Sequence, residues 1–423
     1  MRILRPLARR PVALLWGGLA MSAIGDQVYI VAIAWIGVLA FGPRAGWLNA
    51  LGSACALVTV LFSGPWVDRF RPAAAMVAAD GVRALVLLLV VGAWVAGLPP
   101  VVWASLLVLA VAVLGAGQGV FRPALQDVMP ATVADPALLP AANALFDSTE
   151  RIARLLGPGL IGVLSAALSP VWFLLLDALT FVVSGLCVRR VGAGLPRAAT
   201  PRVRLPAGEA LLLGFRTTMR HRVLGWQLLT VGPNNGTWMV VYYLAVPLMV
   251  ERHGLTLGGG ASGGGFGAYG LVLLGYGVTN LLGNLVVGNR DMPVRPARQI
   301  AVGNFLMGVG MAGIGFTEWL PLAPGERLAS YVGLAAVSAL SGPLQDIPVG
   351  VLRQTDLARS DVPAAMRAYM SASQGGMLVA LSVAPLLLSV VSAGTLVAGC
   401  GVLTVLLAVR TFTRDAPPRP VAA

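Results

Sequence analysis

The chain has 423 residues, of which 57% are hydrophobic and only 11% are charged, and its formal net charge is +13. A soluble globular protein carries about 25% charged residues, so this composition excludes an ordinary soluble domain and favours a polytopic membrane protein. All 30 basic residues are arginines, scattered through short segments between apolar runs. That distribution argues against nucleic-acid binding and for orientation in a membrane with contact to anionic lipid.

Twelve apolar runs can each supply the roughly 20 residues that a helix needs to cross a bilayer. The first run follows four arginines but continues to residue 41, which is far longer than the apolar part of a signal peptide. We therefore expect it to be an uncleaved span. The predicted spans are 12–41, 46–66, 73–97, 99–121, 139–168, 170–188, 223–250, 267–288, 297–317, 328–352, 363–388 and 392–411.

The loop charges predict an orientation for these spans. With the N-terminus in the cytoplasm, 24 arginines fall in cytoplasmic segments, whereas external loops carry only Arg44, Arg252 and Arg327. Such an asymmetry is typical of the positive-inside rule. We therefore expect a multi-pass protein of the cytoplasmic (inner) cell membrane with both termini in the cytoplasm.

The longest polar interruption is 189–222, which contains eight arginines and separates six spans from six spans. Within it Leu211, Phe215 and Met219 recur at helical spacing, which predicts a short helix lying on the inner leaflet. The expected organisation is a six-helix bundle at 1–188, a cytoplasmic central loop at 189–222, a second six-helix bundle at 223–412 and a cytoplasmic tail at 413–423.

Two weak internal repeats support this division. The segment 139–148 recurs as 362–371 at an offset of 223 residues, and Asp68-Arg69 has a degenerate echo at Asn289-Arg290 at an offset of 221. Near-equal offsets close to half the chain favour a duplicated six-helix unit. Chance matching between segments rich in alanine and proline is the alternative.

Signatures of enzymes and cofactors are nearly absent. The two histidines, His221 and His253, are predicted on opposite sides of the membrane, and the three cysteines lie far apart in apolar runs. The segment 265–270 matches G-x-G-x-x-G but follows no predicted strand, and the chain has no lysine for a Walker motif. We expect no metal site, no cofactor and no enzymatic activity.

Charged residues inside spans are informative because each costs about 2.5–3.5 kcal/mol at a helix centre on insertion scales. Acids and arginines in the third and fifth spans have the spacing to neutralise each other within one helix. Structural pairs that hold helices together are the alternative to a functional role. The predicted pairs are Asp80 with Arg83, Asp147 with Arg151, and Glu150 with Arg154.

Three acids, Asp26, Asp177 and Asp346, have no basic partner in their own span. A lone buried carboxylate is costly in its charged form, so it can bind and release a proton. Asp26 is the strongest candidate for proton coupling, because it lies near mid-span and its neighbour Gly25 lets another helix approach. Asp346 lies near the inner end of its span and can simply be hydrated.

Uncharged polar residues mark a predicted substrate cavity. The segment 232–236 contains Pro233 between two glycines, which predicts a break in the seventh span that faces this cavity. Hydrogen bonds that join helices are the alternative role for these residues. The cavity candidates are Asn234, Asn235, Asn280, Asn284, Asn304 and Gln345.

The loop between the second and third spans has the spacing G-x-x-x-D-R-x-R, formed by Gly64, Asp68, Arg69 and Arg71. This spacing resembles the loop between helices 2 and 3 of major facilitator superfamily transporters, although Pro72 stands where that family often has a further basic residue. We therefore predict that the loop is a conformational switch and that Asp68 holds the bundles in one state.

Further segments resemble the third drug:proton antiporter family of that superfamily, which includes macrolide-efflux and enterobactin-exporter proteins. They are Ser22–Asp26, Asp80–Ala84 and Asp177–Phe181. In the fifth span Gly157, Pro158 and Gly162 resemble the exporter pattern G-x-x-x-G-P-x-x-G-G, with Ala153 and Ile161 replacing two of its glycines. In that family the pattern accompanies export by antiport.

The resemblance implies an all-α integral membrane protein with twelve transmembrane helices in two six-helix bundles, the major facilitator fold. It also implies alternating access driven by protons. We therefore expect a monomeric transporter that exports a small amphiphilic organic molecule, of the drug, siderophore or natural-product class, as in multidrug resistance. An importer or a lipid transporter on the same fold is the first alternative. A membrane enzyme, or a sensor that binds ligand without moving it, is the second.

Overall fold

The computed structural model describes residues 2–62, 71–133, 135, 138–165, 167–195, 207–257, 264–290, 295–358 and 361–412. Nearly all of these residues are helical and none of them forms a strand, which confirms the all-α fold class. A helix satisfies its backbone N–H and C=O groups within one segment, as hydrocarbon surroundings require.

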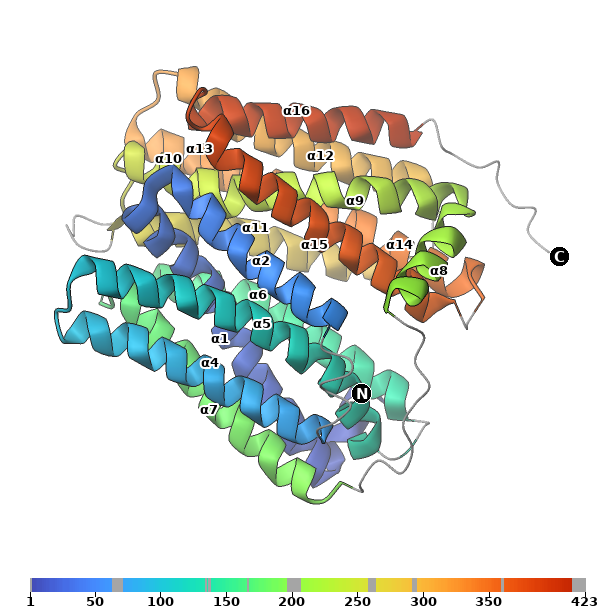
Figure 1. Ribbon diagram of the computed structural model, residues 1–423. Helices are drawn as coiled ribbons and strands as arrows, with labels where there is room; N and C mark the ends of the chain where they lie inside the picture. The colour runs from blue at the N-terminus through green and yellow to red at the C-terminus, as the bar shows by residue number, and fades with distance from the viewer. Residues whose placement is uncertain are drawn as a thin grey trace. The chain divides into compact units, whose positions relative to one another are not determined.

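The chain forms two compact units, and the first contains residues 1–40, 51–204 and 261–263. In this unit α4 packs against both α5 and α7 (Figure 1). A buried cluster that includes Leu15 of α1, Met76 of α4, Phe121 of α5 and Val188 of α7 joins these four helices. The helices of the unit are η1 (Arg2–Ala8), α1 (Arg10–Phe41), most of α2 (Ala45–Phe62), α4 (Pro72–Val95), α5 (Pro100–Val133), α6 (Leu139–Leu164) and α7 (Pro170–Ala193).

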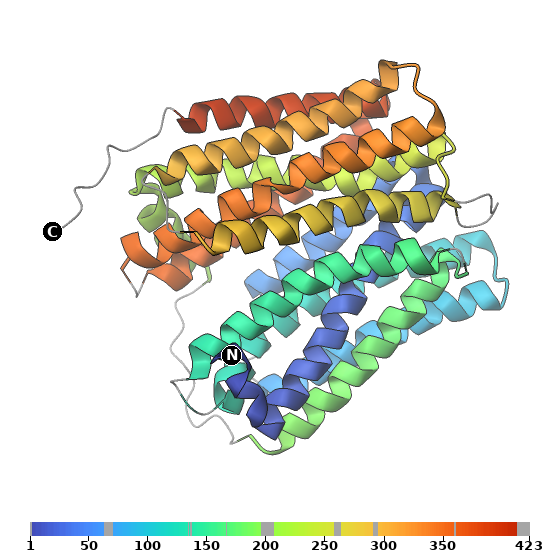
Figure 2. The same cartoon turned by 180° about the vertical axis from the view of Figure 1, so that it is seen from behind.

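The second unit contains residues 41–50, 205–260 and 264–423. Figure 2 shows α12, in amber, beside α16, in red. Glycines allow this close approach, because a Cβ added to Gly308 would lie only 2.7 Å from the Gly401 carbonyl oxygen. The elements of the unit are η2 (Gly42–Arg44), α8 (Ala207–Met219), α9 (Arg222–Val240), η4 (Val241–Ala245), α10 (Val246–Arg252), α11 (Gly264–Gly288), α12 (Pro296–Phe316), η5 (Thr317–Trp319), α13 (Pro324–Ala339), α14 (Ser341–Asp356), α15 (Val362–Leu387) and α16 (Ala393–Phe412).

Proline and glycine set the ends of several helices. Pro72, Pro100 and Pro170 each occupy the first position of a helix, where a missing backbone N–H costs nothing. After α4, Gly97 has a φ of 62°, and its N–H donates to the Trp94 carbonyl while that of Leu98 donates to Ala93. These two bonds form a Schellman motif, which requires the left-handed backbone that glycine adopts without strain.

Eight helical stretches of the described chain are long and apolar enough to cross a bilayer, judged by length and composition alone. One of them, Arg10–Thr59, covers two of the predicted spans. Predicted span 139–168 carries four charged residues, span 223–250 is divided among α9, η4 and α10, and span 328–352 is divided between α13 and α14. All twelve predicted ranges contain helix, but the count of twelve membrane crossings and the bundle boundaries stay predictions.

Two expectations about helix boundaries are wrong. The fourth predicted span ends at residue 121, whereas α5 continues through Pro123 and Pro130 to Val133. The break predicted at 232–236 is also absent, because α9 is continuous through Pro233 and the irregular turn is the π-helical η4, one turn later. Both prolines of α5 and that of α9 are tolerated, as is usual for helices in membrane proteins.

The predicted switch loop falls largely outside the described residues, which exclude Gly64, Asp68 and Arg69. Arg71 is described, and its Nη2 donates to the Leu195 carbonyl oxygen at 3.5 Å. The helix α8 occupies the central loop where a short helix is expected. Its position on the membrane surface, like the role of the switch loop, stays a prediction.

Candidate functional site

Asp26 is placed by the packing of α1 against α7. Gly18 and Gly25, two turns apart on α1, both face α7. A Cβ on Gly18 would lie 2.8 Å from the Cβ of Cys187, and one on Gly25 would overlap Thr180 Oγ1 and Asp177 Oδ1. Only glycine permits this approach, which places the next residue, Asp26, at the edge of the α1–α7 contact.

Asp177 lies at the same crossing and is fully buried. Its Oδ1 accepts a hydrogen bond from the Thr180 hydroxyl at 3.2 Å, while Oδ2 has no hydrogen-bond donor within the described residues. A buried carboxylate oxygen without a partner is costly. Asp177 is therefore neither exposed to water nor neutralised by an ion pair among the described side chains.

Asp80 and Arg83 form a buried pair on α4, with 3.8 Å between Asp80 Oδ1 and Arg83 Nη1. This confirms the predicted neighbourhood of the two residues, but the distance is long for a charge-assisted hydrogen bond. Ser184 of α7 lies beside Asp80, yet neither carboxylate oxygen makes a hydrogen bond of normal geometry to a described residue. The pair is thus loose despite its burial.

Aromatic rings hold the Arg83 guanidinium from two sides. Its Cζ lies 5.5 Å from the ring centroid of Phe121 on α5 and 5.2 Å from that of Phe181 on α7. Gly117 of α5 leaves the space for this side chain, because a Cβ there would overlap Arg83 Nε. These contacts are of the cation–π kind, and they do not neutralise the charge of the guanidinium.

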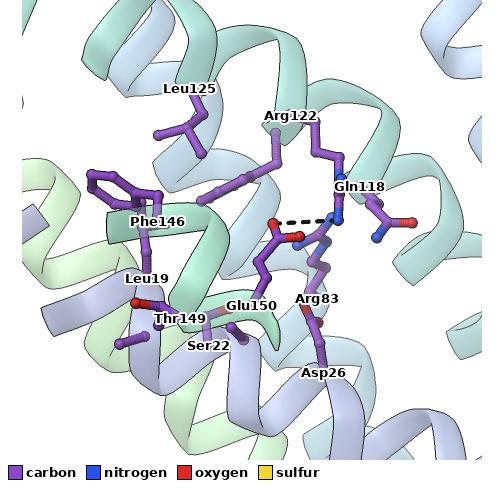
Figure 3. A pocket seen from close by; sticks show the side chains of 13 residues that line it. Leu19, Ser22, Asp26, Arg83, Gln118, Arg122, Leu125, Phe146, Thr149 and Glu150 are labelled. Atoms are coloured by element: carbon purple, nitrogen blue, oxygen red, sulfur yellow. Dashed lines mark ion pairs between the residues drawn. The ribbon is translucent and has the colours of Figure 1, made fainter. Parts of the chain in front are cut away.

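A cavity of about 90 Å³ opens beside these groups in the first unit. Figure 3 shows Asp26, Arg83, Arg122 and Glu150 reaching it from α1, α4, α5 and α6. Arg122 and Glu150 are about half exposed and form an ion pair at 3.5 Å. Asp26 is half-buried and forms no ion pair among the described residues. The remaining wall includes Leu19, Gln118, Phe121, Leu125 and Phe146.

The helix α6 packs onto α1 next to Asp26. A Cβ on Gly157 would lie 2.5 Å from the Cβ of Gln27, and the Trp16 indole donates to Thr149 Oγ1 at 2.9 Å. Pro158 is buried in the same stretch. The exporter-type segment therefore contacts the part of α1 that carries the proton-coupling candidate. Gly162 is part of α6, but its surroundings, like the side chains of Asp147 and Arg151, lie outside what the structure describes.

Glu150 has a different partner from the predicted one. Among the described residues it pairs with Arg122 of α5 and not with Arg154, which is exposed on its own helix. Arg122 was expected in a loop, and the continuation of α5 places it in the cavity wall instead. Gln118 and Arg122 are four residues apart, so they lie on one face of α5 and both line the cavity. This spacing is the sequence signal that could have identified the wall, provided that α5 continues beyond residue 121.

Of the six polar residues proposed for a cavity in the second half, Asn235 and Asn280 join helices there, whereas Asn284 bonds within α11. Asn235 donates to Ser373 Oγ of α15 at 2.7 Å, Asn280 donates to the Ala339 carbonyl at 3.0 Å, and Asn284 donates to the Asn280 carbonyl at 2.8 Å. Asn234, Asn304 and Gln345 are buried. Asp346 is exposed on α14 in the second unit and does not belong to the cavity of the first.

The comparison with known families decides what kind of protein carries this site. A family model described as Major Facilitator Superfamily matches residues 15–355. The chain belongs to the major facilitator superfamily. It is therefore a transmembrane transporter of a small molecule and not an enzyme.

Relatives within the superfamily include a drug exporter. The chain is similar to the Multidrug efflux pump Tap of Mycobacterium tuberculosis (strain ATCC 25618 / H37Rv), with 27% identity over 361 residues, which cover 80% of this chain and 78% of that one. It is also similar to the Uncharacterized MFS-type transporter y4rN of Sinorhizobium fredii (strain NBRC 101917 / NGR234), with 22% identity over 408 residues, which cover 95% and 94% of the two chains.

Solved structures establish the fold of this superfamily member. A POT family transporter in complex with 5-aminolevulinic acid matches with a TM-score of 0.70 and 11% identity over 94% of this chain and 95% of that one. A bacterial homologue of iron transporter ferroportin in inward-facing state matches with a TM-score of 0.67 and 14% identity over 95% and 98% of the two chains. The major facilitator fold is thus shown, whereas the cargo of these proteins says nothing about this one.

Proposed function

We propose that this transporter exports a small amphiphilic organic molecule by proton antiport with alternating access, and that Asp26 is the group that couples the two movements. The observation that carries the proposal is the half-buried Asp26 carboxylate, which lines a cavity and has no ion-pair partner among the described residues. It lies near the middle of a helix that is apolar enough to cross a bilayer.

The chemistry follows from the cost of an unpaired carboxylate in low-dielectric surroundings. Asp26 is stabilised there either by binding a proton or by facing a cationic group. A proton and a cationic substrate group therefore compete for the same oxygens. Asp26 therefore holds either the proton or the substrate but not both. Arrival of the substrate then requires release of the proton towards the cytoplasm, which is the simplest form of antiport.

The size of the cavity fits part of a substrate. Its 90 Å³ holds several water molecules, whereas pockets that enclose drug-sized ligands measure about 300–1,000 Å³. We infer that the cavity receives the charged end of an amphiphile against Asp26. The aromatic rings of Phe121 and Phe146, in the same wall, contact the adjacent apolar part.

Two further observations support export. The similarity to a multidrug efflux pump extends over four fifths of the chain. The Gly157–Pro158 segment, which resembles the exporter pattern, packs on Gln27, directly beside Asp26. A change in the bend of α6 at this point would act on the segment of α1 that binds the proton.

We further propose that the protein acts as a monomer in the cytoplasmic membrane, with both termini in the cytoplasm and two six-helix bundles at 1–188 and 223–412. The arginine distribution supports this topology. Single cysteines introduced beside Arg202 and beside Gly260 should then react with a membrane-impermeant reagent from opposite sides. Reaction of both from the outside would contradict the orientation.

Proton release in everted membrane vesicles tests the transport proposal. The vesicle lumen is acidified, and amphiphilic cations such as ethidium are added together with matched neutral and anionic compounds. A transported cation should release luminal protons in vesicles that contain the protein and not in vesicles with Asp26→Asn. Asp135→Asn is the matched control, because Asp135 pairs with Arg9 at 3.9 Å away from the cavity.

The alternatives predict different results in the same vesicles. An importer would move the compound out of the lumen, and a facilitator would equilibrate it without moving protons. A sensor would bind the compound in purified form and show no flux. Any of these outcomes with a folded protein contradicts the proposal of proton-coupled export.

A further inference from the structure

Arg83 lies among more acids than it can neutralise. Its charge acts on Asp26 of α1, Asp80 of α4 and Asp177 of α7. Asp80 and Asp177 are fully buried, and Asp26 lines the same cavity as Arg83. The other cation of the cavity wall, Arg122, already has an ion-pair partner in Glu150. One guanidinium group thus lies beside the carboxylate of Asp80 and shares a cavity with that of Asp26.

The contacts of Arg83 leave it free to change partner. The distance of 3.8 Å to Asp80 is too long for a strong hydrogen bond, and Arg83 Nε has no hydrogen-bond acceptor among the described residues. Phe121 and Phe181 flank the guanidinium without binding its N–H groups, and Gly117 leaves room for its stem. A rotation of the Arg83 side chain therefore breaks no well-formed hydrogen bond to Asp80.

We propose that Arg83 is a positioning residue shared by Asp80 and Asp26, and that it turns from Asp80 towards Asp26 when Asp26 has lost its proton and no substrate cation faces it. This inference rests on the proposed function, in which Asp26 carries the coupled proton. Asp80 then has a role that the sequence did not indicate: it holds Arg83 away from Asp26 and so keeps the proton on Asp26 until the substrate arrives. Asp80 and Arg83 form a switch rather than a static structural pair.

The groups that face Asp26 define the electrostatic balance that the switch alters. They are Tyr29 on its own helix, Asp80 and Arg83 on α4, Arg122 on α5, Glu150 on α6 and Asp177 on α7. Arg122 and Glu150 neutralise each other, and Asp177 accepts a hydrogen bond from Thr180. Only the pair on α4 therefore changes the charge near Asp26 by rotation of one side chain.

The test is an infrared pH titration of the purified full-length protein, which needs no knowledge of the substrate. The band of the protonated Asp26 carboxyl group is assigned by its loss in Asp26→Asn. Asp80→Asn frees Arg83 for Asp26, so the titration midpoint should fall by about 1 pH unit or more, as expected for an opposite charge within contact distance. Arg83→Gln should raise the midpoint by a similar amount.

A double variant separates this switch from a direct effect of the Asp80 charge. If Asp80 acts through Arg83, the shift caused by Asp80→Asn should vanish in the Arg83→Gln background. A shift of unchanged size in that background would overturn the proposal, as would unchanged midpoints in both single variants. Asp80→Glu retains the charge and should restore the wild-type midpoint, which a merely structural role of Asp80 does not predict.

Two controls keep the outcome decisive. Arg9→Gln and Asp135→Asn remove an exposed ion pair of similar length outside the cavity and should leave the midpoint unchanged. Should Arg83→Gln not fold, Arg83→Met replaces it: methionine fills similar space without a charge, so Asp80→Asn should then leave the midpoint unchanged. If no Asp26 band titrates between about pH 5 and 9, the proposed function fails; if one titrates but ignores Asp80 and Arg83, only the switch fails.

Discussion

Replacement of Gly25 by alanine tests whether the α1–α7 contact places Asp26. The added methyl group would overlap Thr180 Oγ1 and Asp177 Oδ1 and would lie 3.1 Å from Thr180 Cβ. Thr180 cannot move away without stretching its hydrogen bond to Asp177, which measures 3.2 Å. The two helices must therefore separate, or the half-buried Thr180 and the buried Asp177 must adopt new rotamers.

The expected cost follows from these contacts. Overpacking of a well-packed site costs about 1–3 kcal/mol, and loss of the Thr180–Asp177 hydrogen bond adds about 1 kcal/mol. The helix preference of alanine over glycine returns about 1 kcal/mol. Gly25→Ala should thus destabilise the protein by about 1–3 kcal/mol. Gly17→Ala, on the same helix, has nothing within 4 Å of the new methyl group and should be neutral or stabilising.

Thermal unfolding of the purified protein in detergent measures the difference. Each kcal/mol shifts Tm by about 2–4 °C in a domain of 150–250 residues, so Gly25→Ala should melt several degrees below Gly17→Ala. Equal Tm values for the two variants would show that α7 does not approach α1 at Gly25. The placement of Asp26 argued above would then be wrong.

Two further predictions concern the second unit. Gly376 of α15 lies at backbone contact with Gly232 of α9, so Gly376→Ala should lower Tm by several degrees. Gly375→Ala is the control, because an added methyl group there has nothing within 4 Å, and its Tm should not fall. Equal Tm values for the two variants would contradict the close crossing of α9 and α15. Burial, with the nearby charge of Arg327, lowers the pKa of His253, which follows α10, below its ordinary value of 6.5. The unfolded chain therefore binds this proton first, so stability should fall as pH drops through 6.5 towards the folded pKa. His253→Gln should flatten the Tm profile in that window, and an unchanged slope would contradict the pKa assignment.

The parts of the fold that could be predicted are those set by runs of apolar residues. The helices lie over all the predicted ranges because a long apolar segment in a membrane has no alternative to helix. The importance of Gly25 could also be predicted from its place beside Asp26, and the structure shows that α7 is the helix that approaches there. These features depend on local sequence only.

The parts that could not be predicted depend on packing between helices. The spacing places Asp80 beside Arg83 on one helix, but nothing in the sequence brings Asp26 or Asp177 towards Arg83, because they belong to two other helices. Pro233 misled the prediction of a break, since α9 continues through it, and α5 likewise continues through two prolines beyond the predicted end of its span. Arg122 consequently changed from a loop residue to the partner of Glu150 in the cavity wall.

The most direct test of the central claim compares two kinds of transport by Asp26→Asn in proteoliposomes. The asparagine keeps the shape of the aspartate but cannot titrate. We predict that this variant loses accumulation of an amphiphilic cation driven by a pH gradient, yet still exchanges labelled for unlabelled cation across the membrane. Full gradient-driven accumulation by Asp26→Asn between about pH 6 and 8 would contradict the assignment of Asp26 as the proton-coupling residue.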